Sequence, residues 1–76
     1  MFHISGFYKF KKIKNIKKSK ELLNNFFTKH KIRGTVIISL EGINGTISSK
    51  KKELELALLK IKKIFNISKF DSQNFS

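Results

Sequence analysis

A chain of 76 residues forms one domain, close to the smallest size at which a hydrophobic core alone holds a fold. It contains no cysteine, which excludes disulfide bridges, thiolate metal sites and a cysteine nucleophile in these residues. No apolar run approaches the roughly 20 residues that span a bilayer, and the alternating N-terminus is unlike a signal peptide. We therefore expect a cytoplasmic protein without a membrane partner.

The formal net charge of +12 favours a nucleic acid as partner, because clustered lysines gain affinity by releasing counterions from phosphates. A second explanation stays open from the sequence alone. Lysine, isoleucine, phenylalanine and asparagine have AT-rich codons, and together they make up 41 of the 76 residues. Base drift in an AT-rich genome would supply much of this lysine without selection for a ligand.

The first predicted element is a strand over residues 2–10, where aromatic and β-branched residues dominate. Four apolar side chains share one of its faces at period two: Phe2, Ile4, Tyr8 and Phe10. Phe7, Tyr8 and Phe10 could stack on bases, but aromatic residues in a central strand are more often core residues. A basic connection over residues 11–20 follows.

Residues 19–30 are predicted to form the first helix. Its buried stripe has residues at i, i+4 and i+8 with two apolar neighbours: Leu22, Phe26, His30, Leu23 and Phe27. The cations around its end lie beside the carbonyl end of the helix dipole. We expect His30 to lie at the core edge or the helix end, rather than to act as a ligand or a base.

A β-branched run over residues 35–40 predicts the second strand, and residues 46–48 predict a short returning strand. Asn44-Gly45 is a strong signal for a type I′ turn between them, flanked by Ile43 and Thr46. Gly42 is not needed for that turn and indicates a bulge or a close approach of another backbone or ligand. Glu41 has two open interpretations: a solvated residue paired with a lysine, or a residue that orients a basic side chain or contacts a partner domain.

The second helix is predicted to begin after a cap at Ser48 or Ser49, with Glu53 in its first turns. Its apolar residues recur at helical spacing: Leu54, Ala57, Leu58, Ile61, Ile64 and Phe65. Residues 67–76 begin as a possible last strand. The chain reads as cut rather than finished, so we expect the native protein to continue.

The resulting order, β-α-β-β-α-β, is the α+β ferredoxin-like arrangement, a two-layer sandwich with an antiparallel sheet. Right-handed crossovers place the first and third strands centrally and both helices on one face. The basic connection and the glycine turn then lie at the same end of the sheet. The candidate nucleic-acid-binding residues at that end are Lys11, Lys12, Lys14, Lys17 and Lys18.

The sequence contains no Ser-His-Asp grouping, no metal-ligand spacing and no phosphate-binding glycine loop. We predict no catalytic residue, metal site or cofactor for these residues, and whether they belong to an enzyme stays open. One alternative is a small acylphosphatase-like hydrolase, which has this topology. That family needs an arginine in a glycine-containing loop after the first strand and an asparagine on the second strand. Here the loop has only lysines, and Asn44 is expected in the turn.

Another alternative is a free-standing regulatory or oligomerisation module with a small-metabolite ligand. Only the versatility of the fold supports it. The oligomeric state is not readable from the sequence.

The stretch "RGTVIISLEGINGTIS", residues 33–48, together with the opening "FYKF", residues 7–10, resembles the N-terminal domain of the rhodanese-domain tRNA uridine hydroxylase family. The resemblance covers nearly the whole chain. Its most specific part is a six-residue motif: Glu41, Gly42, Ile43, Asn44, Gly45 and Thr46.

In that family a rhodanese domain follows and carries the cysteine thought to be catalytic. The full enzyme hydroxylates the wobble uridine of certain tRNAs in an oxygen-dependent reaction. The resemblance implies that residues 1–76 are a single non-catalytic N-terminal domain of a longer, rhodanese-containing oxidoreductase. Its implied partners are tRNA and the downstream rhodanese domain of the same chain, and the motif is expected to have a structural or domain-contacting role.

Overall fold

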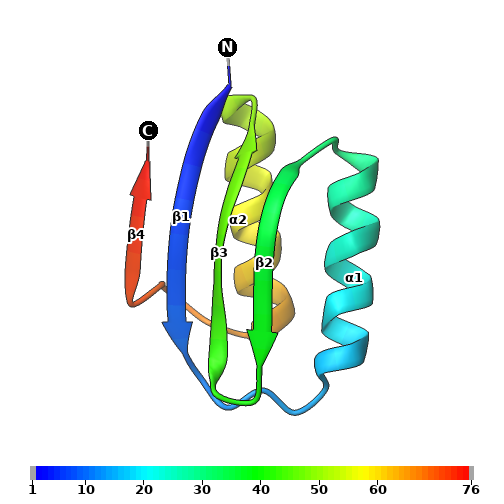
Figure 1. The fold of residues 1–76 in the computed structure, drawn as a ribbon, viewed down its shortest axis with the longest axis vertical. Coiled ribbons are helices and arrows are strands. Elements are labelled where there is room, and N and C mark those ends of the chain that lie inside the picture. Colours follow the sequence, from blue (N-terminus) through cyan, green and yellow to red (C-terminus); the bar gives the residue numbers. More distant parts are fainter. Residues whose placement is uncertain (1, 76) are drawn as a thin grey trace.

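The computed structural model describes residues 2–75, which form a four-stranded sheet and two helices (Figure 1). In chain order the elements are β1 (His3–Phe10), α1 (Ile16–Lys29), β2 (Arg33–Ser39), β3 (Gly42–Ser49), α2 (Lys51–Phe65) and β4 (Ser72–Phe75). The strand order is β2-β3-β1-β4, and every neighbouring pair is antiparallel. The predicted ferredoxin-like sandwich, with the first and third strands central, is confirmed. Neither described helix is long and apolar enough to cross a membrane.

The predicted Asn44-Gly45 turn is wrong. β2 and β3 pair as far as Ser39 and Gly42, so the connection consists of Leu40 and Glu41. Neither of these two residues has a positive φ, which excludes the type I′ geometry. The longer β3 is favoured over a strand that begins after Asn44-Gly45, because β3 also pairs with β1 over the whole length of both strands. A turn at Asn44 would remove half of the pairs between β1 and β3.

Two glycines of the motif allow strands to approach closely. Gly42 has φ +154°, and a Cβ there would collide with the carbonyl oxygen of Lys9 on β1. Gly45 lies opposite Phe7, and a Cβ there would lie 3.0 Å from Phe7 Cζ. The expected close backbone approach at Gly42 is therefore found, and Gly45 leaves the room that the Phe7 ring occupies.

Helix α2 supplies the largest part of the core. The predicted stripe is confirmed, since five of its members are buried: Leu54, Ala57, Leu58, Ile61 and Phe65. Glu53 lies in the first turn as predicted, but the N-cap is Lys50, without a side-chain cap hydrogen bond. The predicted cap at Ser48 or Ser49 is wrong because β3 continues through both serines, where Ser49 pairs with His3.

Helix α1 begins at Ile16, three residues before the predicted start. The side chain of Asn15 caps it by accepting a hydrogen bond from the Lys18 N–H at 3.4 Å. Leu23 is buried, whereas Leu22 is 41% exposed, so the buried stripe is rotated from the predicted one. Phe26 and Phe27 pack against the core from partly buried positions.

The apolar face predicted for the first strand is not the buried face. Ser5 and Phe7 point toward the helices and are buried, while Phe2, Ile4 and Phe10 are exposed. The register explains the difference, because Ser5 lies opposite Ile47 and Phe7 opposite Gly45, on the face that Ile43 and Ile47 share. The other side of the sheet, which α1 and α2 leave uncovered, is called the open face below.

Candidate nucleic-acid interface

The basic connection lies at the same end of the sheet as the β2–β3 turn, as predicted, and it packs directly against the turn residues Leu40 and Glu41. The backbone N–H of Lys11 donates to the carbonyl of Glu41 at 3.0 Å, and that of Ile13 donates to the carbonyl of Leu40 at 3.2 Å. The buried side chain of Ile13 anchors the connection to the core. This end of the molecule, where β1 and β2 both finish, lies at the bottom of Figure 1 and is called the basic end.

The five predicted lysines all lie at the basic end, on two elements rather than one. Lys11, Lys12 and Lys14 belong to the connection, and Lys17 and Lys18 belong to the first turn of α1. Lys11 is half-buried, and its Nζ donates to the carbonyl of Asn66 at 2.8 Å, where α2 ends. The other four are exposed. Their role in binding nucleic acid stays a prediction.

Three carboxylates lie near these lysines: Glu21, one turn along α1 from Lys17 and Lys18, and two on the side of the sheet, Glu41 and Asp71. Glu41 is exposed in the turn, and its backbone N–H donates to Ser39 Oγ at 3.3 Å. The ion pairs found among residues 2–75 do not include Glu41, so the expected pairing with a lysine is not observed.

Asp71 is the other carboxylate on the side of the sheet, and it fastens the segment before β4 to the end of β1. It accepts the backbone N–H of Phe10 at 2.7 Å and the Nζ of Lys9 at 3.2 Å. The hydrogen bond from Phe10, and then that from Lys9, lower the pKa of Asp71. Lys9 balances its charge, so Asp71 does not offset the lysines of the connection.

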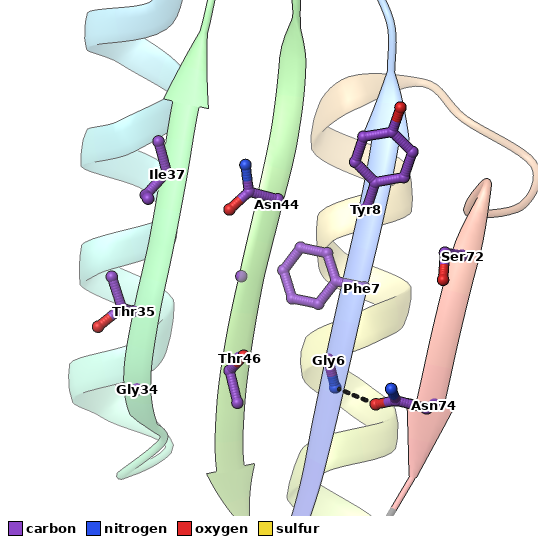
Figure 2. Close-up of a pocket in the computed structure, with 11 residues that line it drawn as sticks. Gly6, Phe7, Tyr8, Gly34, Thr35, Ile37, Asn44, Thr46, Ser72 and Asn74 are labelled. Carbon is purple, nitrogen blue, oxygen red and sulfur yellow. Dashed lines mark hydrogen bonds between the residues drawn. The ribbon is translucent and has the colours of Figure 1, made fainter.

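The six-residue motif divides between the turn, the core and the open face. Glu41 lies in the turn and Gly42 begins β3, while Ile43 is buried. Asn44 and Thr46 project from the open face, as Figure 2 shows, and Gly45 lies between them in the sequence. Gly42 and Ile43 are buried and Gly45 is half-buried, whereas Asn44 and Thr46 are exposed, and the expected role of the motif stays a prediction.

The open face contains a shallow depression of about 690 Å³ that extends across all four strands (Figure 2). Ile37, Asn44, Tyr8 and Ser72 lie in one row, from β2 to β4. The Tyr8 and Phe10 rings form an edge-to-face pair with centroids 5.0 Å apart. Sequence reasoning missed this surface because it assigned these aromatic residues to the core, and only the cross-strand register could have corrected it.

A second cavity, of about 420 Å³, lies at the opposite end of the sheet. His30 Nδ1 lies 2.9 Å from Glu53 Oε2, and the His30 ring packs on Phe26 with centroids 4.2 Å apart. His30 is the C-cap residue of α1, which confirms its predicted place at the helix end. The pairing of His30 with Glu53 was not predicted, because the residue pattern of each helix does not show how α1 and α2 lie against one another.

The chain lacks both of the residues that an acylphosphatase-like hydrolase needs. The connection after β1 has no arginine, and β2 has no asparagine. Asn44 lies within β3 and not in the turn, which corrects the expectation but does not supply the missing group. Within residues 2–75 no three His, Asp or Glu side chains gather closely enough to hold a metal ion.

Residues 2–75 match the UPF0176 acylphosphatase-like domain. A tRNA uridine(34) hydroxylase of Pelagibacter ubique is 54% identical over all 76 residues, which cover 25% of that relative. A tRNA uridine(34) hydroxylase of Wigglesworthia glossinidia brevipalpis is 45% identical over 61 residues, 80% of this chain and 19% of the relative. The chain thus spans about a quarter of the length of these relatives, or less.

Among solved structures, full-length HypF in its phosphate- and nucleotide-bound form superposes with a TM-score of 0.71. The match covers the whole chain and 10% of HypF at 16% identity, so it shows the fold alone. The domain match over residues 2–75 and the 54% identity over the whole chain show that this chain belongs to the family of the UPF0176 acylphosphatase-like domain.

Proposed function

We propose that this chain acts as a non-catalytic accessory domain of a tRNA wobble-uridine hydroxylase, and that its basic end contacts the tRNA backbone. The names of its relatives support the reaction, since they are tRNA uridine(34) hydroxylases. The relatives are several times longer, which leaves room for the catalytic residues in a downstream domain of the same chain.

The convergence of lysines at the basic end carries the proposal. Four exposed lysines come together there from the connection and from the first turn of α1. That turn contains no acidic residue, so the positive end of the helix dipole adds to the lysine charges. Two backbone hydrogen bonds hold the connection on the β2–β3 turn. Such a cationic surface, held in place by hydrogen bonds, favours an anionic ligand such as the phosphate backbone of a nucleic acid.

The test is a charge reversal at three exposed positions of the basic end, Lys12→Glu, Lys14→Glu and Lys17→Glu together. The parent and the variant are titrated with tRNA at several salt concentrations, and circular dichroism confirms that both are folded. Each phosphate contact contributes about 0.7 to 0.9 to the slope of log K against log salt. We expect the slope to fall by about 2 and the affinity at low salt to fall at least tenfold.

The matched control reverses Lys50, Lys51 and Lys52, which are exposed at the opposite end of the sheet. It changes the net charge by the same amount. A larger loss for the basic-end triple supports the proposal. Equal losses would mean that only net charge matters, and parental binding by the basic-end triple would exclude this surface.

A further inference from the structure

The open face combines exposed aromatic rings with a central polar strip. Phe10 is 65% exposed, and it contacts the half-buried ring of Tyr8. Beside Tyr8 in the same row lies Asn44 of β3. In the next row Asn74 of β4 turns its Oδ1 to the backbone N–H of Gly6 at 3.1 Å. Its amide nitrogen remains available on the same surface, as Figure 2 shows.

This aromatic surface continues into the basic end. Phe10 is the last residue of β1, and the next two residues along the chain are Lys11 and Lys12. A second hollow joins the depression of Figure 2 to the β2–β3 turn, and its lining includes Tyr8, Phe10, Asn44 and the carboxylate residue Glu41. The rows that the described strands form on the open face contain no carboxylate. Rings, amides and cations therefore form one surface, with Glu41 and Asp71 at its border.

We propose that the open face binds unpaired nucleotides of an RNA, with bases stacked on Phe10 and Tyr8 and phosphates over the lysines of the basic end. This inference rests on the proposed function and specifies which part of an RNA the domain contacts. Aromatic platforms beside a cationic rim are how proteins bind single-stranded nucleic acid, because every base presents a face that can stack. Amide side chains such as those of Asn44 and Asn74 can both donate to and accept from base edges.

Charge favours RNA over a second copy of this chain as the occupant of the open face. A second copy of a chain with a net charge of +12 would bring like charges together at the lysines that border this face. An RNA brings the complementary charge. Double-stranded RNA fits less well, because its bases are stacked on one another and a protein reads it through its shape and its 2′-hydroxyls.

The chain provides its own reporter for the test. Tyr8 is the only tyrosine and there is no tryptophan, so the intrinsic fluorescence excited near 280 nm comes from the open face. The titrants are an oligouridine and an abasic oligonucleotide of the same length, which has the same phosphates without bases. We expect both to bind in a salt-dependent way, and only the oligouridine to quench Tyr8 and to bind about tenfold more tightly or better.

The variant Phe10→Ala should lower the affinity for oligouridine about tenfold and leave that for the abasic oligonucleotide unchanged. Phe2→Ala is the matched control. Phe2 is as exposed as Phe10 but borders the cavity at the opposite end, so its loss should change neither affinity. Circular dichroism shows whether each variant is folded.

The outcomes separate the two proposals. Equal binding of both oligonucleotides with unchanged Tyr8 fluorescence overturns the stacking inference and leaves the proposed function intact. A chain that binds neither oligonucleotide nor tRNA overturns both. Sedimentation that shows a dimer, with Tyr8 fluorescence that depends on protein concentration without RNA, would assign the open face to a second copy and overturn the inference.

Discussion

The two faces of the sheet are made by the same strands, yet they have opposite characters. On the side of the helices, Ile47 has no exposed surface and Phe7 is 4% exposed. On the open face, Ile37 is 56% exposed and Phe10 65%. The more apolar set of β1 residues, Ile4, Tyr8 and Phe10, points away from the core, whereas Phe7 is the one apolar residue of the set that faces the helices.

The two faces show that alternation sorts the residues of a strand into two sets but does not say which set is buried. The helices decide that. Helix α2 covers the side where Ile43 and Ile47 lie, and β1 must turn Ser5 and Phe7 to that side to stay in register with β3. Exposed rings and branched side chains on the remaining side are available for a ligand.

The largest effect expected from this comparison is at the centre of the buried face. Ile47→Ala should lower the free energy of unfolding by about 2–5 kcal/mol, because it removes buried methyl groups and leaves a cavity. The milder Ile47→Val should cost about 0.5–1.5 kcal/mol and remains measurable if the alanine variant is too unstable. Urea unfolding followed by circular dichroism gives both values.

The matched change on the open face is Ile37→Ala. Because Ile37 is already largely hydrated, we expect a loss of less than about 1 kcal/mol in the same urea experiment. Similar losses at Ile37 and Ile47 would mean that the open face is covered in solution, which would contradict the comparison.

An effect smaller than that at Ile47, and of opposite sign, is expected at Ser5. Its side chain is fully buried on the helix side, and Ser5 Oγ has no hydrogen-bond partner among the residues described. A buried hydroxyl without a partner is destabilising, so Ser5→Ala should raise the free energy of unfolding by about 1 kcal/mol. The control is Ser48→Ala on the open face, where we expect no stabilisation. A destabilised Ser5→Ala would show that the hydroxyl does find a partner, such as a water molecule.

The smallest effect is expected at the exposed rim, where Asp71 fastens the segment before β4. Its pKa in the folded chain lies below the ordinary value of 3.8, because it accepts hydrogen bonds from Phe10 and Lys9. The ionised carboxylate therefore stabilises the fold above the unfolded pKa, and this stabilisation is lost as the pH falls through the lowered pKa.

The measurement is the thermal midpoint of the parent and of Asp71→Asn between pH 7 and pH 2. We expect the parent to be slightly more stable at pH 7 and the difference to vanish at the acid end. Glu55→Gln, at an exposed position on α2, is the control. A difference between the parent and Asp71→Asn that does not change with pH would argue against a role for the charge.

Helix α2 and the order of the elements could be predicted because their signals are local. Leu54, Leu58, Ile61 and Phe65 recur at helical spacing whatever packs against them. The errors occurred where a local signal competed with pairing over a longer distance. Asn44-Gly45 favours a turn in isolation, but the ladder between β1 and β3 stabilises Asn44 and Gly45 as strand residues.

Some features of the candidate site could likewise be predicted from the sequence and others could not. The lysines of the connection and the meeting of that connection with the turn followed from the fold, since β1 and β2 run in the same direction. The His30–Glu53 pair and the aromatic surface of Tyr8 and Phe10 could not be predicted. Each depends on how two elements distant in sequence are placed against one another.

The sequence by itself determined the family, the order of strands and helices, the apolar stripe of α2 and the end of the sheet where the lysines gather. These follow from a specific motif, from helical and strand periodicity, and from the directions that short connections impose. Only the tertiary structure decided where the hairpin turns and which face of β1 is buried. Alternation alone favours burial of the more apolar set of β1, but pairing with β3 beneath α2 turns Ser5 and Phe7 to the core instead.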